Sequence, residues 1–281
     1  MDSGCYIGGV ALEAPTKVIV MCRWIAYRGE TTALEHYVTE PSHSLISQSI
    51  HALESTASIN GDGFGLGWYA LHPEPGLYRE IRPAWSDENL RYLCRHLQSH
   101  LYFAHVRAAT GTAITRVNCH PFASGKWMFM HNGFLGNWGR WRRQVEALIP
   151  DELYPSRNGT TDSEAIFLAM MGAGIDKPLA AAEKILGVLT DYVNRSEPGE
   201  RFRFTAALAN GRDLYAFRYA VNDHANTLYY RESDRGIVIV SEPFDRDKNW
   251  VTVPENHAVV ACAGERARLV PLFHRHQQAA E

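Results

Sequence analysis

The chain has 281 residues, of which 46% are hydrophobic and 21% charged, so it can bury a sizeable core and is not intrinsically disordered. Its net charge of −3 gives no electrostatic argument for a nucleic-acid or an anionic-membrane partner. Five widely spaced cysteines, no secretory signal and no long apolar run favour a soluble protein of a reducing, cytoplasmic compartment.

The first half of the chain predicts strands and helices in alternation. Residues 1–20 show no clear periodicity and form an appendage, and a strand is predicted over 22–27, ending at Arg28-Gly29. Ser42-His43-Ser44 opens a helix with an apolar stripe at Leu45, Ile46, Ile50 and Leu53, and Ser86 caps a second helix through residue 97. Further strands are predicted over 64–69, 101–106 and 127–130.

The second half predicts three helices followed by strands. The helices cover 138–149, 161–171 and 178–194, and Thr161 to Glu164 has capping-box spacing. From Phe202 onward strands are predicted over 205–209, 214–217, 228–231, 236–241 and 259–262, with Asn210-Gly211 as a two-residue hairpin turn. Strands with tight hairpins and helices grouped between them predict one α+β domain of mostly antiparallel sheets covered by helices.

The dipeptide Met21-Cys22 is typical of a nucleophile at a mature N-terminus. Removal of residues 1–21 would give Cys22 a thiol and a free α-amine, whose reference pKa values are about 8.5 and about 7.7–8.0. Such an amine can act as general base for the thiol beside it, whereas an amide nitrogen cannot. For Cys22 alone, the role of a small buried hydrophobic residue is favoured.

Three further motifs supply what a thiol would need to hydrolyse a glutamine-like amide. Asn132-Gly133 offers a side-chain amide and a backbone N–H for an oxyanion hole, and Arg107 offers a fork for a substrate carboxylate. Asp162 offers a carboxylate for a substrate ammonium group. Singly, each residue is equally well explained as a turn, an ion pair or a helix-end acid, but together with Cys22 they are not independent coincidences.

These motifs carry a resemblance to the class II glutamine amidotransferases, a branch of the N-terminal nucleophile hydrolases. The chain resembles that family from Met21-Cys22-Arg23-Trp24 through 60–65, 105–110, 118–122, 131–133 and 161–164 to Ser241-Glu242-Pro243. The resemblance implies a four-layer αββα sandwich over residues 22–281, with a leader over 1–21 that is absent or removed in the active form. It also implies hydrolysis of glutamine or another γ-glutamyl amide through a γ-glutamyl thioester, without a cofactor or a metal.

The resemblance also assigns roles to individual residues. Cys22 is the nucleophile, Asn132 and Gly133 form the oxyanion hole, and Arg107 and Asp162 hold the amino-acid end of the substrate. Thr110 and His120 line the glutamine pocket.

Ala108 and Gly111 occupy positions where synthase-fused members commonly have Trp and His, so this segment is closer to the stand-alone amidohydrolases. Relatives of that kind act on ergothioneine precursors or glutathione. A separate acceptor or synthase subunit stays open.

Two alternatives remain at this point. A metal hydrolase could use His105, Cys119, His120 and His131, although their spacing fits no HExxH or paired CxxC pattern. A regulatory pseudo-enzyme could bind a γ-glutamyl ligand while the leader masks Cys22.

For the leader itself we favour translation starting at Met21, over self-cleavage of a propeptide or a retained inhibitory segment. We expect residues 1–20 to pack loosely or to lie across the site.

Overall fold

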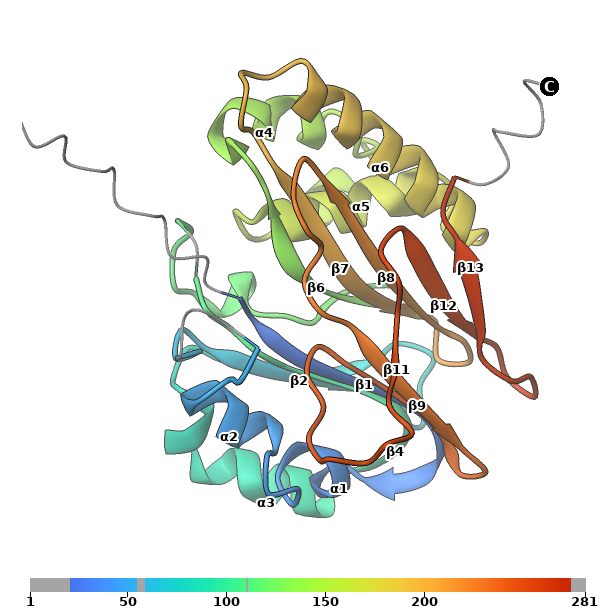
Figure 1. Ribbon diagram of the computed structural model, residues 1–281. Coiled ribbons are helices and arrows are strands. Elements are labelled where there is room, and N and C mark those ends of the chain that lie inside the picture. The colour runs from blue at the N-terminus through green and yellow to red at the C-terminus, as the bar shows by residue number, and fades with distance from the viewer. Residues whose placement is uncertain (1–20, 55–58, 110, 274–281) are drawn as a thin grey trace, which may run out of the picture.

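The structure is a computed structural model that describes residues 21–54, 59–109 and 111–273. Two antiparallel β-sheets face each other, and each is covered on its outer side by helices (Figure 1). The α+β fold and the αββα sandwich expected from the sequence are therefore confirmed. The expected arrangement of the leader, residues 1–20, lies outside the described residues. In the part of the chain that is described, no helix is long and apolar enough to cross a membrane.

The first sheet has seven strands. They are β1 (Arg23–Ala33), β2 (Phe64–Trp68), β3 (Gly76–Glu80), β4 (Gln98–Val106), β9 (Tyr229–Ser233), β10 (Gly236–Val240) and β11 (Val251–Thr252), in the order β11-β9-β10-β1-β4-β2-β3. Its outer face is covered by α1 (Glu35–Val38), α2 (Leu45–Ile50) and α3 (Glu88–His96).

The second sheet has six strands. They are β5 (Phe122–Ser124), β6 (Trp127–Leu135), β7 (Phe202–Ala209), β8 (Leu214–Val221), β12 (His257–Ala261) and β13 (Arg268–Pro271), in the order β13-β12-β8-β7-β6-β5. Its outer face is covered by α4 (Trp138–Glu146), α5 (Asp162–Gly172) and α6 (Pro178–Asn194). Short 3₁₀ turns lie at Ala84–Ser86, Arg116–Asn118 and Tyr154–Ser156.

The core divides into three apolar layers because successive side chains of a strand point to opposite faces. In β1, Trp24 and Ala26 belong to the middle layer between the sheets, whereas Ile25 and Tyr27 pack beneath α1–α3. In β6, Met130 lies in the middle layer and Phe129 stacks on Phe167 of α5. This alternation decides which polar side chains at the strand ends enter the space between the sheets.

Several strands are longer than the sequence predicted, and β1 and β6 are extended the most. β1 continues past Arg28-Gly29 to Ala33, with a register shift between Arg28 and Thr32. Gly29 does not end the strand: a Cβ there would collide with the backbone oxygen of Arg235, so glycine permits the close approach of β10. β6 likewise continues through Asn132 to Leu135.

Several predicted helix ends were wrong. The N-cap of α3 is Asp87, whose Oδ1 accepts a hydrogen bond from Leu90 N–H (3.1 Å), and Ser86 lies in the preceding 3₁₀ turn. α2 stops at Ile50, so Ile50 and Leu53 are 49% and 69% exposed and do not form part of an apolar stripe. α4 ends three residues before Ile149, which is nevertheless buried.

The capping box before α5 is confirmed only in part. Thr161 Oγ1 accepts a hydrogen bond from Glu164 N–H (3.2 Å), as predicted. The Glu164 carboxylate instead accepts from the N–H groups of Asn158 (3.1 Å) and Gly159 (2.7 Å) and pairs with Arg157. The acid thus fixes the loop that leads into α5.

The β7–β8 hairpin is confirmed, but its loop has four residues, 210–213. Asn210 Oδ1 accepts from the N–H groups of Arg212 (2.9 Å) and Asp213 (2.7 Å), which stabilises the longer turn. The sequence analysis missed α1 and the short strands β3, β5, β11 and β13.

Candidate active site

The thiol of Cys22 lies at one end of the space between the two sheets. Cys22 directly precedes β1, and the alternation of that strand places its side chain on the same face as Trp24 and Ala26. Its Sγ accepts a hydrogen bond from Ala108 N–H (3.4 Å) and lies 3.6 Å from Ala108 O. Burial raises the pKa of the thiol, although the Ala108 N–H and the charge of Arg107 act in the opposite direction. A thiol in this place needs a base to become a nucleophile at neutral pH.

Arg107 is a buried cation whose hydrogen-bond partners in the described part of the chain carry no charge. The residue is 3% exposed and follows β4 directly. Its Nη2 donates to Thr112 Oγ1 (2.7 Å) and Ala113 O (3.5 Å), and its Nη1 donates to Asp62 O (3.4 Å). A buried guanidinium without a carboxylate partner is costly unless a ligand supplies one. Arg107 is therefore placed to bind an anionic group beside Cys22.

The turn at Asp62 holds Arg107 and Ala108 against Cys22. Asp62 N–H donates to Arg107 O (3.0 Å), and Asp62 Oδ2 accepts from Ala109 N–H (2.8 Å). Arg107 N–H in turn donates to Gly63 O (2.8 Å). The sequence analysis included 60–65 in the family resemblance but gave Asp62 no role, because nothing local shows which distant segment its carboxylate would bind.

Asn132 presents an unused donor to the space between the sheets. It shares a face of β6 with Met130, is 2% exposed, and its backbone oxygen accepts from Asn226 Nδ2 (3.2 Å). Among the described residues, Asn132 Nδ2 has no hydrogen-bond partner. A buried donor without a partner is rare in a native fold and is expected where a ligand completes the bond.

The N–H of Gly133 points away from β7. Leu135 N–H donates to Asp162 Oδ2 (2.7 Å). Gly136 N–H instead donates to the oxygen of Arg201 (2.8 Å), the residue directly before β7. Because alternate residues direct their N–H groups to opposite edges, Gly133 N–H shares the edge of Leu135. In the described part of the chain, the strand at that edge, β5, pairs with 127–129 of β6 and does not reach Gly133. This N–H is thus available next to the amide of Asn132.

Asp162 lies at the same edge of β6, at the start of α5. In addition to Leu135 N–H, it accepts a hydrogen bond from Ser163 N–H through Oδ1 (2.8 Å). Ser163 Oγ also lies 2.8 Å from His131 Nδ1, and His131 Nε2 lies 3.1 Å from Arg203 O. Burial lowers the pKa of His131, so the neutral ring donates from Nε2 and accepts at Nδ1. This network fixes β6 against α5 around Asn132.

His120 is buried in the middle layer, where its ring lies against that of His105 (centroids 4.3 Å apart) and packs edge-on to Phe122. Burial lowers the pKa of His120 well below its ordinary value and that of His105 to about 3. Among the described residues, His120 has no hydrogen-bond partner on either ring nitrogen, and its role in a substrate pocket stays a prediction. Thr110 lies outside the described residues.

The metal-hydrolase alternative gains no support. In the described part of the chain, no three His, Cys, Asp or Glu side chains are placed to hold a metal ion. Cys119, one of the imagined ligands, is fully buried and directs its Sγ to Glu80 O and Thr115 O (3.5 Å each).

The carbonyl oxygen of Cys22 is bound by a member of a buried ion pair that the sequence analysis did not predict. Arg23 Nη1 donates to Cys22 O (3.0 Å), and Arg23 Nε donates to Glu242 Oε2 (2.9 Å). Arg23 is 0% and Glu242 2% exposed. Burial by itself raises the pKa of Glu242, but hydrogen bonds from His43 and from backbone N–H groups lower it overall. The carboxylate therefore stays charged opposite Arg23.

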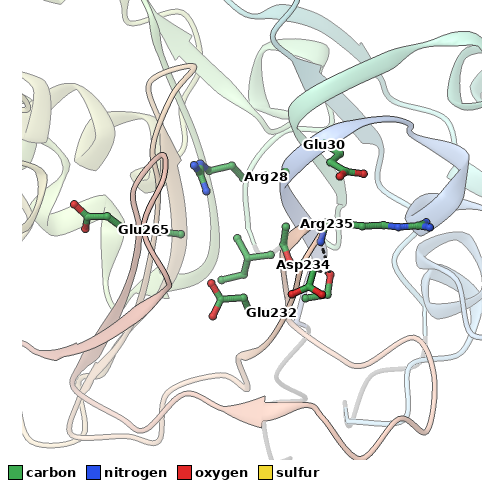
Figure 2. A pocket seen from close by; sticks show the side chains of 11 residues that line it. Arg28, Glu30, Glu232, Asp234, Arg235 and Glu265 are labelled. Atoms are coloured by element: carbon green, nitrogen blue, oxygen red, sulfur yellow. Dashed lines mark hydrogen bonds between the residues drawn. The ribbon is translucent and has the colours of Figure 1, made fainter.

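A cavity of about 300 Å³ lies elsewhere, along the second half of β1 and the β9–β10 hairpin. Figure 2 shows charged side chains of both signs around it, among them Arg28, Glu30, Glu232 and Glu265. Arg28 is six residues beyond Cys22, roughly 20 Å along an extended strand. This cavity is separate from the site at Cys22.

Comparison with known proteins agrees with this geometry. The sequence profile of the class II glutamine amidotransferases matches residues 36–229. A probable glutamine amidotransferase, DUG3 of Saccharomyces cerevisiae, is 30% identical, with 92% of this chain and 86% of the yeast protein aligned. The γ-glutamyl-hercynylcysteine sulfoxide hydrolase of Mycolicibacterium smegmatis is 28% identical, with 85% and 95% aligned.

Solved structures agree as well. A glutamine aminotransferase class-II domain protein from Silicibacter pomeroyi has a TM-score of 0.70 and 34% identity, covering 89% of this chain and 99% of its own. The glutamine phosphoribosylpyrophosphate amidotransferase of Bacillus subtilis has a TM-score of 0.62 at 14% identity over 89% of this chain and 49% of its own, a likeness of fold alone. With the family profile, the yeast relative and the fold in agreement, the chain belongs to the class II glutamine amidotransferases.

Proposed function

We propose that this protein hydrolyses the side-chain amide of glutamine or of another γ-glutamyl amide, with the thiol of Cys22 as nucleophile. The observation that carries the proposal is that Sγ of Cys22 is hydrogen-bonded to Ala108 N–H, directly beside the buried cation Arg107, which has no carboxylate partner among the described residues. The family and the names of the relatives support γ-glutamyl amide hydrolysis in general. Nucleophile, base and substrate are our inference.

In the proposed reaction, the α-amine of Cys22 takes the thiol proton as Sγ attacks the γ-carbonyl carbon of the substrate. Asn132 Nδ2 and Gly133 N–H donate to the oxyanion that forms. The amine then passes the proton to the leaving nitrogen, and the C–N bond breaks to give a γ-glutamyl thioester. A water molecule, deprotonated by the same amine, hydrolyses the thioester to glutamate and restores the thiol.

Arg107 and Asp162 hold the amino-acid end of the substrate in this proposal. Arg107 receives the α-carboxylate, because its partners among the described residues are hydroxyl and carbonyl oxygens. Asp162 receives the α-ammonium group, because its carboxylate lies at the edge of β6 where Gly133 N–H is available. Thr110 and His120 complete the pocket. A cytoplasmic location and a separate acceptor subunit remain predictions.

The proposal requires a chain that begins at Cys22. While Met21 is attached, the nitrogen of Cys22 is an amide and cannot accept the thiol proton. A protein that keeps its leader would bind γ-glutamyl ligands without hydrolysing them, which is the pseudo-enzyme alternative.

The test compares three proteins: the full-length chain, a chain expressed from Met21, and the latter with Cys22→Ser. Intact mass establishes which preparation begins at residue 22, and amine release from a panel of γ-glutamyl amides gives the activity. We expect hydrolysis only in the preparation that begins with Cys22. A full-length chain that hydrolyses these amides without processing would refute the proposed base. A processed chain that binds but does not hydrolyse them would support the pseudo-enzyme.

A further inference from the structure

Arg203 faces the same space as Cys22, from the opposite sheet. In β7, Ala207 and Ala209 belong to the middle layer, and the alternation of the strand puts Arg203 on their side. The backbone of Arg203 is also pressed against the oxyanion strand, since a Cβ at Gly133 would collide with Arg203 O. Arg203 is therefore a neighbour of the proposed oxyanion hole.

The guanidinium of Arg203 reaches Met21, the residue before the nucleophile. Its Nη1 lies 4.0 Å from Met21 Sδ. Nε and Nη2 donate to the two oxygens of Asp223 (2.7 and 2.9 Å), whereas Nη1 donates to Asn226 Oδ1 (3.2 Å). Because Nη1 carries two N–H groups, one of them remains on the side of Met21. Asn226 also donates to Asn132 O (3.2 Å), so Arg203 and the oxyanion residue share a support.

The space now held by Met21 is where the leaving amine of a substrate must go. In the proposed reaction, the α-amine of Cys22 hands its proton to the leaving nitrogen, so these two nitrogens must be neighbours. That α-amine is the atom now bonded to Met21. Once Met21 has been removed, the substituent on the leaving nitrogen occupies the vacated side of the site, next to Arg203 Nη1.

Two arginines lie at the carboxylate of Asp223, so these three groups together carry a net charge of +1. Arg203 pairs with Asp223, and Arg201 Nη1 lies 3.9 Å from the same carboxylate. Two guanidinium groups thus face one carboxylate. An anionic substituent on the leaving amine could accept a hydrogen bond from Arg203 and would be attracted by this charge. The ammonia released from glutamine carries no such substituent and would gain nothing from either.

We infer that Arg203 is a specificity-determining residue and that the preferred substrates are γ-glutamyl amides whose amine carries a carboxylate, namely γ-glutamyl amino acids or peptides. The inference rests on the proposed function and specifies its substrate class. Water cleaves the amide, and the products are glutamate and an amino acid or peptide with a free amine.

The test uses two substrates that differ only in that carboxylate: γ-glutamylglycine and γ-glutamylmethylamide. For the chain that begins at Cys22, we expect kcat/KM for the first to exceed that for the second by tenfold or more. Arg203→Gln should lower this ratio about tenfold, the lower end of what a hydrogen bond to a charged group contributes, because Asp223 already neutralises part of the guanidinium. The ratio does not depend on the folded fraction, since both substrates meet the same preparation.

Two further variants test whether the change in this ratio comes from the charge of Arg203. Asp223→Asn removes the partner that neutralises Arg203 and should raise the ratio, the opposite direction to Arg203→Gln. Arg195→Gln, on the exposed end of α6, removes an arginine whose side chain is 74% exposed and should leave the ratio unchanged. If neither γ-glutamyl amide is hydrolysed, the proposed function fails and this inference fails with it. If both are hydrolysed but the ratio is near one, or responds to neither Arg203→Gln nor Asp223→Asn, only the inference is overturned.

Discussion

Replacing Asn132 by leucine separates a catalytic amide from a structural one. The side chain is 2% exposed and its Nδ2 has no partner among the described residues, so the folded protein already bears the cost of a buried unsatisfied donor, about 1–3 kcal/mol. Leucine is close in shape and has no donor to satisfy. We therefore expect Asn132→Leu to leave the free energy of unfolding unchanged or to raise it. By contrast, kcat should fall about 10²–10³-fold, because an oxyanion donor acts on the transition state.

Asn118 provides the matched control for stability. It is 1% exposed, its Nδ2 donates to Ala113 O (2.9 Å) and Thr160 Oγ1 (3.1 Å), and its Oδ1 accepts from Thr160 N–H (2.8 Å). Asn118→Leu would leave those partners unsatisfied and should lower the free energy of unfolding by about 2–4 kcal/mol. Urea denaturation at pH 7 and steady-state kinetics on one γ-glutamyl amide give both quantities. If Asn132→Leu loses as much stability as Asn118→Leu, or keeps kcat within tenfold, Asn132 is not an oxyanion donor.

Four further outcomes are expected. Cys22→Ala should abolish turnover in a chain that begins at residue 22, whereas Cys94→Ala, on the buried face of α3, should cost stability but keep turnover; the reverse pattern would mean that the nucleophile is wrongly assigned. Arg107→Ala should mainly raise KM, and a loss confined to kcat would argue against carboxylate binding. Gly133→Ala should lower the melting temperature, because its Cβ would collide with Arg203 O; an unchanged value would contradict the close β6–β7 approach. The buried histidines His105, His120 and His131 have pKa values lowered by burial, that of His105 to about 3. Below about pH 6.5 the unfolded chain takes up protons that the buried rings of His105 and His120 do not, so the free energy of unfolding should fall by up to about 1.4 kcal/mol per pH unit for each of these two. His131 acts in the same direction, and a flat profile between pH 7 and 5 would contradict the prediction.

The sequence allowed a site residue to be predicted when a residue with reactive or polar chemistry lay directly beside an apolar run that indicates a strand. Asn132-Gly133 and Arg107 each follow an apolar run, and the side chain of Cys22 precedes one. The sequence misjudged where those strands end. The apolar run of β6 is interrupted by His131 and Asn132, yet the backbone continues in the sheet to Leu135. Polar residues inside a strand break the pattern on which the prediction depends, and functional residues are where such breaks are expected.

The residues that the sequence missed act on partners far along the chain. Asp62 binds the backbone at Ala109, and Glu242 pairs with Arg23, 219 positions away. Arg203 and Asn226 reach Met21 and Asn132 from the second sheet. No local pattern encodes such contacts, because they arise only when two sheets are stacked and strand alternation turns particular side chains into the shared layer.

The two arginines give the proposed substrate a direction. Arg107 directly follows β4 of the first sheet, and Arg203 lies in β7 of the second. Cys22 lies between them: its Sγ contacts Ala108, next to Arg107, and the residue before it, Met21, contacts Arg203. A γ-glutamyl amide would thus place its α-carboxylate against the first sheet and its leaving amine against the second. Removal of the residues before Cys22 then has two consequences at once. It would convert an amide nitrogen into a base, and it would clear the side chain of Met21 from the place where the proposed reaction puts the leaving amine. A γ-glutamyl compound without a substituent on its leaving nitrogen needs only the new base and not the cleared space. The discrimination between substrates should therefore depend on Arg203, and the hydrolysis itself on Cys22.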